Sequence, residues 1–253
     1  MKPRIVNILW TGGLDSSFRV IELSQMEVII QPYYIIDPVR SSLHYELKAI
    51  ETISNIIRKH PKTKAQLLNL KKIYIKDINP DKDITDAFNR LHNKYTIGHQ
   101  YDLIARYAKQ KNIRFEMSLE KSVRSKAMNC ILSETNLASF SDGKYKVLRV
   151  EQQNSTTDGW IIYSHIDLPV SLWEMTKEEE INRLKELGHQ NTIKYTWFCH
   201  FPVWGMPCGH CNPCRDCLNE GLAFRVPKLG RLLYYIYNYY LFSYLLKIFL
   251  LNN

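Results

Sequence analysis

The first part of the chain alternates short apolar runs with amphipathic segments. Residues Arg4–Trp10 form a nearly continuous apolar run, which predicts a strand buried on both faces, as in a parallel sheet. Glu27–Asp37 predicts a second strand, in which Pro32 indicates an edge position or a bulge. Between them, a Gly-Gly loop leads into a segment that opens at Asp15 and carries apolar residues at helical spacing. The pattern predicts a strand–loop–helix–strand unit.

The same alternation continues along most of the chain. Helical spacing of apolar residues predicts helices at Leu43–His60, Ile84–Leu91, His99–Gln110 and Thr176–Leu187. Further strands are predicted at Lys72–Ile78, Ile113–Leu119, Tyr145–Val150 and Trp160–His165. The last predicted helix opens with a Thr-Lys-Glu-Glu start, and Gly188 is its expected stop. Strands that alternate with helices predict an α/β fold with a parallel sheet.

Composition and charge narrow the class of protein. The 253 residues are 45% apolar and 23% charged, which is typical of a globular protein and excludes fibrous or disordered classes. The net charge of +9 favours an anionic ligand, nucleic acid or an acidic membrane surface. Basic patches lie at Lys62–Lys72 and Arg106–Arg114, and a solvated basic face is the favoured explanation for them. With no signal-peptide pattern at the start, the mature chain is expected to begin at or near Met1.

The cysteines are concentrated in one segment. Five of the six lie within residues 199–217, and the sixth, Cys130, is expected to be a small buried hydrophobe. Clustered thiols spaced by two residues suit a metal better than a disulfide framework and indicate a reducing, cytoplasmic location. The thiols expected to surround zinc are Cys199, Cys208, Cys211 and Cys214. Cys217 is a fifth thiol that leaves an iron–sulfur cluster as the main alternative, while His200 and His210 are expected to be neighbours rather than ligands.

Residues 8–18 (ILWTGGLDSSF) carry a phosphate-binding pattern. Small residues between a buried strand and a helix let backbone N–H groups approach an anion, and the helix dipole adds to the attraction. The segment has neither the lysine of a Walker A sequence nor the third glycine of a dinucleotide fingerprint. It resembles the SGGxDS loop of the PP-loop ATP pyrophosphatases, with Thr11 in place of the first serine. That resemblance implies a doubly wound, mostly parallel sheet and cleavage of ATP between its α and β phosphates.

The resemblance also implies roles for individual residues. The hydroxyls and amides of the loop would hold pyrophosphate, and Asp15 would fix the loop or a Mg²⁺ ion, with Asp15 and Ser16 as the catalytic residues. The residues expected to bind ATP are Leu9, Trp10, Thr11, Gly12, Gly13, Leu14, Asp15, Ser16, Ser17 and Phe18. Asp37, at the end of the second predicted strand, lies where such folds place a nucleotide crevice, or is a turn residue.

The cysteine segment carries a second resemblance. Its four thiols are separated by eight, two and two residues, follow Thr196-Trp197 and include a Cys208-Gly209-x-Cys211 turn. With the upstream Leu168–Val170 and Met175–Glu179 segments, this pattern is similar to the zinc site of the 7-cyano-7-deazaguanine synthase family. The resemblance implies a ligase that uses ATP, Mg²⁺ and ammonia to convert a 7-carboxy-7-deazaguanine-like carboxylate into an amide and then a nitrile. A closed four-thiolate zinc site would be structural.

The chain departs from that family in the middle. The family has a Pro-Gly-Arg-Asn stretch that lines the base pocket, whereas this chain has Ile97-Gly98-His99-Gln100. His99 and Gln100 are therefore candidate pocket residues, or a plain helix start. Two alternatives stay open. The first is a PP-loop enzyme with another acceptor, in tRNA sulfuration or attachment of a deazaguanine-like group to a protein or nucleic acid. The second is a non-catalytic zinc module that binds nucleic acid.

The C-terminal tail, Leu232–Leu251, is apolar and rich in tyrosine. A helix of about 20 such residues is long enough to span a bilayer, but it can equally be buried in a homodimer seam. The expected organisation is a PP-loop domain over residues 1–230, which includes a zinc knuckle at 196–217, followed by a tail helix at 231–253.

Overall fold

The computed structural model describes residues 3–119, 125–152, 156–237 and 239. Its strands are β1 (Arg4–Leu9), β2 (Val28–Ile36), β3 (Gln66–Leu67), β4 (Lys71–Tyr74), β5 (Phe115–Glu116), β6 (Leu137–Asp142), β7 (Tyr145–Val150) and β8 (Ile166–Pro169). They form an eight-stranded sheet in the order β3-β2-β1-β5-β8-β7-β6, with β4 also paired to β2. The pairs from β3 and β4 through to β8 are parallel, and β6–β7 and β7–β8 are antiparallel. The predicted mostly parallel sheet is confirmed.

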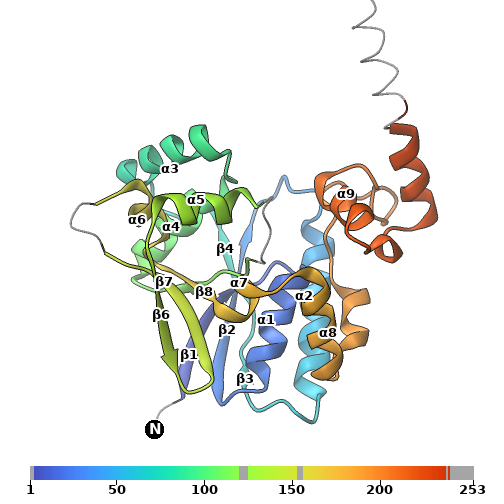
Figure 1. Ribbon diagram of the computed structural model, residues 1–253, viewed down its shortest axis with the longest axis horizontal. Helices are drawn as coiled ribbons and strands as arrows, with labels where there is room; N and C mark the ends of the chain where they lie inside the picture. Colours follow the sequence, from blue (N-terminus) through green and yellow to red (C-terminus); the bar gives the residue numbers. More distant parts are fainter. Residues whose placement is uncertain (1–2, 120–124, 153–155, 238, 240–253) are drawn as a thin grey trace, which may run out of the picture.

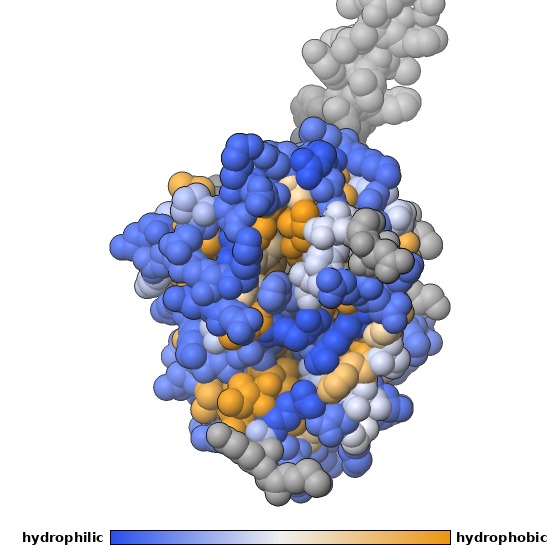
Figure 2. All heavy atoms as spheres, turned by 90° about the vertical axis from the view of Figure 1, so that its left-hand side faces the viewer, coloured by the Kyte–Doolittle hydropathy of each residue, from blue (hydrophilic) through white to orange (hydrophobic). Residues whose placement is uncertain are grey.

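Helices cover both faces of the sheet (Figure 1). They are α1 (Leu14–Ser24), α2 (Leu43–Lys59), α3 (Lys82–Tyr95), α4 (Gln100–Lys111), α5 (Lys126–Glu134), α6 (Asp158–Tyr163), α7 (Val170–Glu174), α8 (Lys177–Glu186) and α9 (Asn212–Asn219). One apolar core joins α1, α2 and α8 to the sheet, and a second joins α3, α4, α5 and α6 to it. The fold is therefore doubly wound. The surface on the side of α3, α6 and the β6–β7 hairpin is mostly hydrophilic, with smaller apolar areas between the polar ones (Figure 2).

Pro32 does not mark an edge, because β2 lies inside the sheet. On the side away from β1, β3 pairs with Ile29 and Ile30, and β4 pairs from Tyr33 onward. Pro32 falls between these two pairings, where its missing N–H removes no ladder bond on that side. The side-chain amide of Gln31 links β2 to the segment between β3 and β4 by donating a hydrogen bond to the Asn69 carbonyl at 2.9 Å.

The strand predicted at Trp160–His165 is wrong. Its first four residues lie in α6, where the Thr157 hydroxyl accepts a hydrogen bond from the Trp160 N–H and caps the helix, and Ser164 and His165 follow in a turn. A short apolar run fits a buried strand and a buried helix equally, so the cap decides. Helix α8 follows its prediction closely. Thr176 and Glu179 form a capping box, and Gly188 beyond its end has a φ of 82°.

The C-terminal part of the described chain is helical over residues 228–237. Most of the predicted Leu232–Leu251 helix lies outside the described residues. Within the described ranges, no helix combines the length and apolar character needed to cross a membrane.

Candidate active site and metal centre

The side of the loop between β1 and α1 that faces the protein interior is fixed by close packing and hydrogen bonds. Gly12 has a φ of +74°, and a Cβ added there would lie 2.7 Å from the Glu46 carbonyl oxygen. Glycine is therefore required for the loop to pass this close to α2. The buried indole of Trp10 donates to the Ser17 hydroxyl at 3.0 Å, and Phe18 lies in the core. These contacts fix the shape of the loop.

The front of the loop presents polar groups to a cavity. The hydroxyls of Thr11 and Ser16 are 3.2 Å apart, and the Thr11 N–H donates to the Ser16 hydroxyl at 3.3 Å. Helix α1 starts after Gly13, which offers no side-chain cap, so the N–H groups of its first turn lack the usual side-chain acceptor. A helix start of this kind favours an anion.

The cavity has a volume of about 650 Å³ and lies beyond the carboxyl ends of β1, β2 and β5. Parallel α/β sheets bind their ligands at this edge. Its lining includes Asp15 and Ser16 from the loop, Asp37 from the end of β2, and His99 and Gln100 from the start of α4. The predicted residues that line it are Leu9, Trp10, Thr11, Gly13, Leu14, Asp15, Ser16, Asp37, His99 and Gln100. Gly12, Ser17 and Phe18 support the loop from outside this lining.

Three cationic residues of the cavity, Arg40, Lys177 and Arg225, were not anticipated from the sequence. Lys177, the first residue of α8, forms ion pairs with Asp15 and, at 3.2 Å, with Glu180. Arg225 also lines the cavity and donates to the Thr196 hydroxyl at 2.6 Å. Burial lowers the pKa of the Arg225 guanidinium, which remains a cation at neutral pH. Nothing in the spacing of these residues relates them to the loop, so only the fold shows that they face it.

The end of β2 carries a second polar group of residues. The buried Glu46 carboxylate accepts hydrogen bonds from the Tyr34 hydroxyl, Arg40 and Ser42 at 2.6–2.9 Å. Burial and the Glu46 carboxylate raise the pKa of Tyr34, so its hydroxyl stays protonated and donates. Asp37 accepts the Val39 N–H at 3.2 Å, so it is a turn residue as well as a wall of the cavity.

His99 is both a helix start and a pocket residue. It occupies the N-cap position of α4, and its ring stacks on that of His92 with centroids 4.8 Å apart. The Nδ1 atom of His92 lies 2.6 Å from the Ile97 carbonyl oxygen, which holds this ring in place. The imidazole of His99 is thus positioned beside the cavity by a second, fixed imidazole.

The four predicted thiols form one buried cluster. The sulfur atoms of Cys199, Cys208, Cys211 and Cys214 all lie within 4.8 Å of one another. The Cys208–Cys214 and Cys199–Cys211 sulfur distances are both 3.9 Å. A tetrahedral zinc ion with Zn–S bonds of about 2.3 Å needs sulfurs about 3.8 Å apart, so the geometry fits one such ion. The Cys199 and Cys211 thiols, together with burial, raise the pKa of the Cys214 thiol, so a bound cation is needed to keep all four as thiolates.

Cys217 lies apart from this cluster. It packs with Leu222 and Val226 and lines the cavity, while the set of candidate ligands in the described chain contains neither it nor His200 or His210. An iron–sulfur cluster would need its thiolates further apart than these four are, because several iron atoms would separate them. Cys130 is buried in the core, as expected.

The segment that leads into the four-thiol cluster docks directly on the loop between β1 and α1. The Trp197 N–H donates to the Gly12 carbonyl at 2.8 Å, and the Trp197 ring stacks on Tyr45 of α2 with centroids 4.4 Å apart. Residues from Phe198 to Arg225 then complete the wall of the cavity. The two predicted sites are therefore parts of one structure.

A mostly parallel doubly wound sheet, a glycine-containing loop after its first strand and a crevice at the same edge are the architecture of the PP-loop class of nucleotide-binding folds. Residues 5–222 match the model of the family described as queuosine biosynthesis protein QueC, and the chain belongs to this family. Its members are ATP-dependent enzymes. Among solved structures, the chain is similar to a 4-thiouridine synthetase in complex with RNA and ATP, with 15% identity and a TM-score of 0.41 over 91% of this chain. It spans about half (53%) of that structure's chain. No curated protein matches the chain significantly.

Proposed function

We propose that the chain is a ligase that uses ATP to activate a carboxylate similar to 7-carboxy-7-deazaguanine, and ammonia to convert it into an amide and then a nitrile. The observation that carries the proposal is the single cavity that joins the phosphate loop to His99 and Gln100. One compartment of about 650 Å³ is large enough for a nucleotide and a small acceptor side by side. The family membership supports the same reaction.

The loop would hold the triphosphate. Hydrogen bonds would stabilise the negative charge of the departing pyrophosphate. Their donors would be the Thr11 and Ser16 hydroxyls and the N–H groups at the start of α1. Lys177, which pairs with Asp15 at the start of α1, and Arg225 add positive charge beside the loop. Asp15, with its carboxylate on the cavity, would hold Mg²⁺, which supplies charge neutralisation on the phosphates.

The proposed reaction balances in two rounds. In the first, a carboxylate oxygen attacks the α-phosphorus of ATP, pyrophosphate leaves, and ammonia then displaces AMP from the acyl carbon to give the amide. In the second, the amide oxygen attacks another ATP, pyrophosphate leaves again, and loss of AMP and two protons leaves the nitrile. His99, which lines the cavity together with His200, would take up a proton from the attacking nitrogen.

The zinc ion would not take part in bond formation. Four thiolates fill its tetrahedral coordination and leave no position for water or substrate. Its role would be to hold the segment that carries Trp197 against Gly12 and the loop.

The residues that line the acceptor end of the cavity also suit a second kind of acceptor substrate. His99 and Gln100 offer hydrogen-bonding groups different from those of an Arg-Asn pair, which also suits an acceptor on a tRNA or a protein. A different acceptor would leave the adenylation step unchanged, because the loop side of the cavity binds only the nucleotide.

Pyrophosphate release tests the proposal. The zinc-loaded full chain is incubated with ATP, Mg²⁺ and ammonium, with and without 7-carboxy-7-deazaguanine. We expect pyrophosphate and AMP to appear only with the carboxylate, at two ATP per nitrile. Ser16→Ala should lower kcat about 100-fold, as loss of a transition-state donor does, and Ser133→Ala on the exposed face of α5 should not. Pyrophosphate release with tRNA, but not with the carboxylate, would favour the alternative acceptor.

A further inference from the structure

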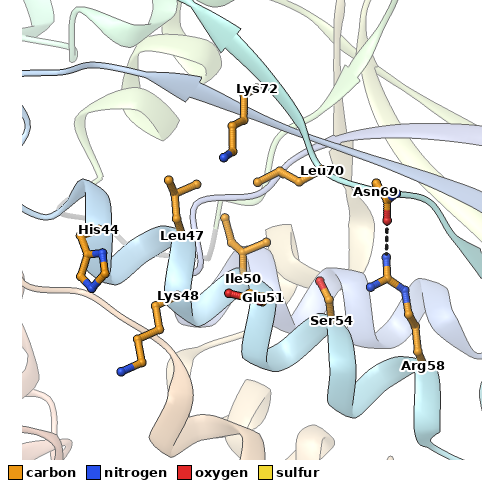
Figure 3. Close-up of a pocket in the computed structure, with 10 residues that line it drawn as sticks. All are labelled: His44, Leu47, Lys48, Ile50, Glu51, Ser54, Arg58, Asn69, Leu70 and Lys72. Carbon is orange, nitrogen blue, oxygen red and sulfur yellow. Dashed lines mark hydrogen bonds between the residues drawn. The ribbon is translucent and has the colours of Figure 1, made fainter.

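A second hollow lies outside the reaction cavity, between α2 and the β3–β4 edge of the sheet (Figure 3). Its volume is about 600 Å³. Leu47, Ile50 and Leu70 give it an apolar floor. Figure 3 shows Lys72 extending from β4 toward α2, while the side chains of α2 line the other wall.

The groove is rich in positive charge. Lys48, Arg58 and Lys72 line it, all three are exposed, and Glu51 is the carboxylate among its lining residues. Arg58 is held by the Leu67 and Leu68 carbonyls and by Asn69, each at 3.3 Å. The two lysines make no ion pair with any described residue. Between residues 43 and 76 the sequence has eight Lys or Arg and two Glu, so the charge extends beyond the groove.

An exposed aromatic hairpin adjoins the end of this groove. Val203 and Met206 pair through two backbone hydrogen bonds of 2.9 and 3.0 Å, and the two residues between them, Trp204 and Gly205, have φ values of 48° and 80°. A two-residue turn with both central residues left-handed normally carries Asn-Gly or Gly-Gly, and a tryptophan there is strained. The indole of Trp204 is nevertheless 84% exposed, so burial does not compensate for this conformation.

The hairpin and the groove meet at the first turn of α2. A Cβ on Gly205 would lie 3.7 Å from the Tyr45 hydroxyl, and Tyr45 is in ring contact with His44, which begins the groove. From His44 to Arg58 the helix rises about 21 Å at 1.5 Å per residue. The hairpin that carries the exposed Trp204 therefore adjoins one end of a cationic groove long enough for several nucleotides.

We propose that this aromatic hairpin and the basic groove together bind a single-stranded nucleic acid. Its phosphates would contact Lys48 and Lys72 along the groove, and one base would stack on Trp204. Basic grooves with exposed aromatic rings are the usual chemistry of single-strand binding. Free phosphate would use the lysines but not the indole, and a planar membrane surface cannot enter a concave groove. None of these residues lines the reaction cavity, so the inference is independent of the proposed function.

The test measures binding of the zinc-loaded full chain to fluorescein-labelled eight-nucleotide RNA and DNA strands by anisotropy, between 50 and 200 mM salt. Lys48→Gln combined with Lys72→Gln should weaken binding at least tenfold. It should also reduce the slope of log Kobs against log[salt] by about 1.4, since each phosphate contact on a single strand contributes about 0.7. Trp204→Ala should weaken binding about tenfold with the slope unchanged, because stacking carries no counterion release.

The matched control is Lys144→Gln combined with Lys146→Gln on the exposed β6–β7 hairpin, which should bind within twofold of wild type. Pyrophosphate release should be the same in all variants, so failure here is distinct from failure of the proposed reaction. Binding of RNA, of DNA or of both supports the proposal and shows which type of nucleic acid the groove prefers. The proposal is overturned if neither RNA nor DNA binds at 50 mM salt, or if the Lys144/Lys146 control loses as much affinity as the Lys48/Lys72 variant. It is also overturned if tripolyphosphate binds as tightly as the oligonucleotides, or if only anionic phospholipid vesicles bind.

Discussion

His189 makes the stability of this protein depend on pH. It follows α8, is 2% exposed, and packs on His60 with ring centroids 4.1 Å apart. Neither of its ring nitrogens has a hydrogen-bond partner among the described residues. Burial, followed by His60 and Lys62, lowers the pKa of His189 from 6.5 to about 4. The folded state therefore holds this imidazole neutral.

The sign and size of the effect follow from proton linkage. The unfolded chain binds a proton near pH 6.5 and the folded chain only near pH 4, so stability is complete above pH 6.5 and is lost as the pH falls toward 4. The full difference of about 2.5 pKa units corresponds to about 3.4 kcal/mol, and about 2 kcal/mol of it is lost by pH 5.

The measurement is the free energy of unfolding in urea at pH 8 and pH 5, for wild type and His189→Phe. Phenylalanine keeps an aromatic ring against His60 but cannot be protonated. The decrease from pH 8 to pH 5 should be about 2 kcal/mol smaller in the variant. Carboxylates and zinc thiolates also titrate in this range, but they do so in both proteins and cancel in the comparison. His44→Phe, at an exposed position, should keep the wild-type decrease. If His189→Phe has the same pH dependence as wild type, His189 is already paired or protonated in the folded state and the reasoning is wrong.

Three further outcomes are expected. Gly12→Ala should lower the free energy of unfolding by about 1–2 kcal/mol because of the left-handed φ, and by more because the new Cβ would contact the Glu46 carbonyl. It should also slow pyrophosphate release. An unchanged midpoint of urea unfolding would contradict this expectation. Cys214→Ser should lower the zinc content measured by atomic emission well below one per chain, while Cys217→Ser retains it; equal loss in both would place Cys217 among the ligands. Glu116→Ala removes the two hydrogen bonds that the buried Arg19 makes to Glu116 and leaves Glu22 as its ion-pair partner, so it should cost about 3 kcal/mol in thermal unfolding; a cost below 1 kcal/mol would show that Glu22 alone compensates the buried charge.

Much of the fold was predictable because its signals are local. The apolar run Arg4–Trp10 became β1, and the capping pattern at Thr176 became the start of α8. The wrong predictions concern segments whose structure is decided by contacts with distant parts of the chain. Pro32 suggested an edge, but β2 has two successive neighbours on one side and tolerates proline between them. The Trp160–His165 run was ambiguous until its capping residue was seen.

The site divides in the same way. The loop after β1 and the four-thiol cluster could be located from the sequence because each lies within a short segment with its own spacing. Lys177 and Arg225 were missed because their relation to Asp15 exists only after folding, across 162 residues in the case of Lys177. Ser17 makes a contact that the loop sequence alone does not indicate, because its hydroxyl accepts a hydrogen bond from the buried Trp10 indole.

The four-thiol cluster and the loop between β1 and α1 are joined by direct contacts, although they are far apart in the sequence. Cys199 lies two residues after Trp197, whose N–H binds the Gly12 carbonyl and whose ring rests on α2. A metal that fixes Cys199 therefore also fixes one face of the loop. Loss of zinc would release this contact together with the wall that carries Arg225. A structural metal can thus control the affinity for ATP without touching the nucleotide, and chelation should weaken ATP binding before the sheet itself unfolds.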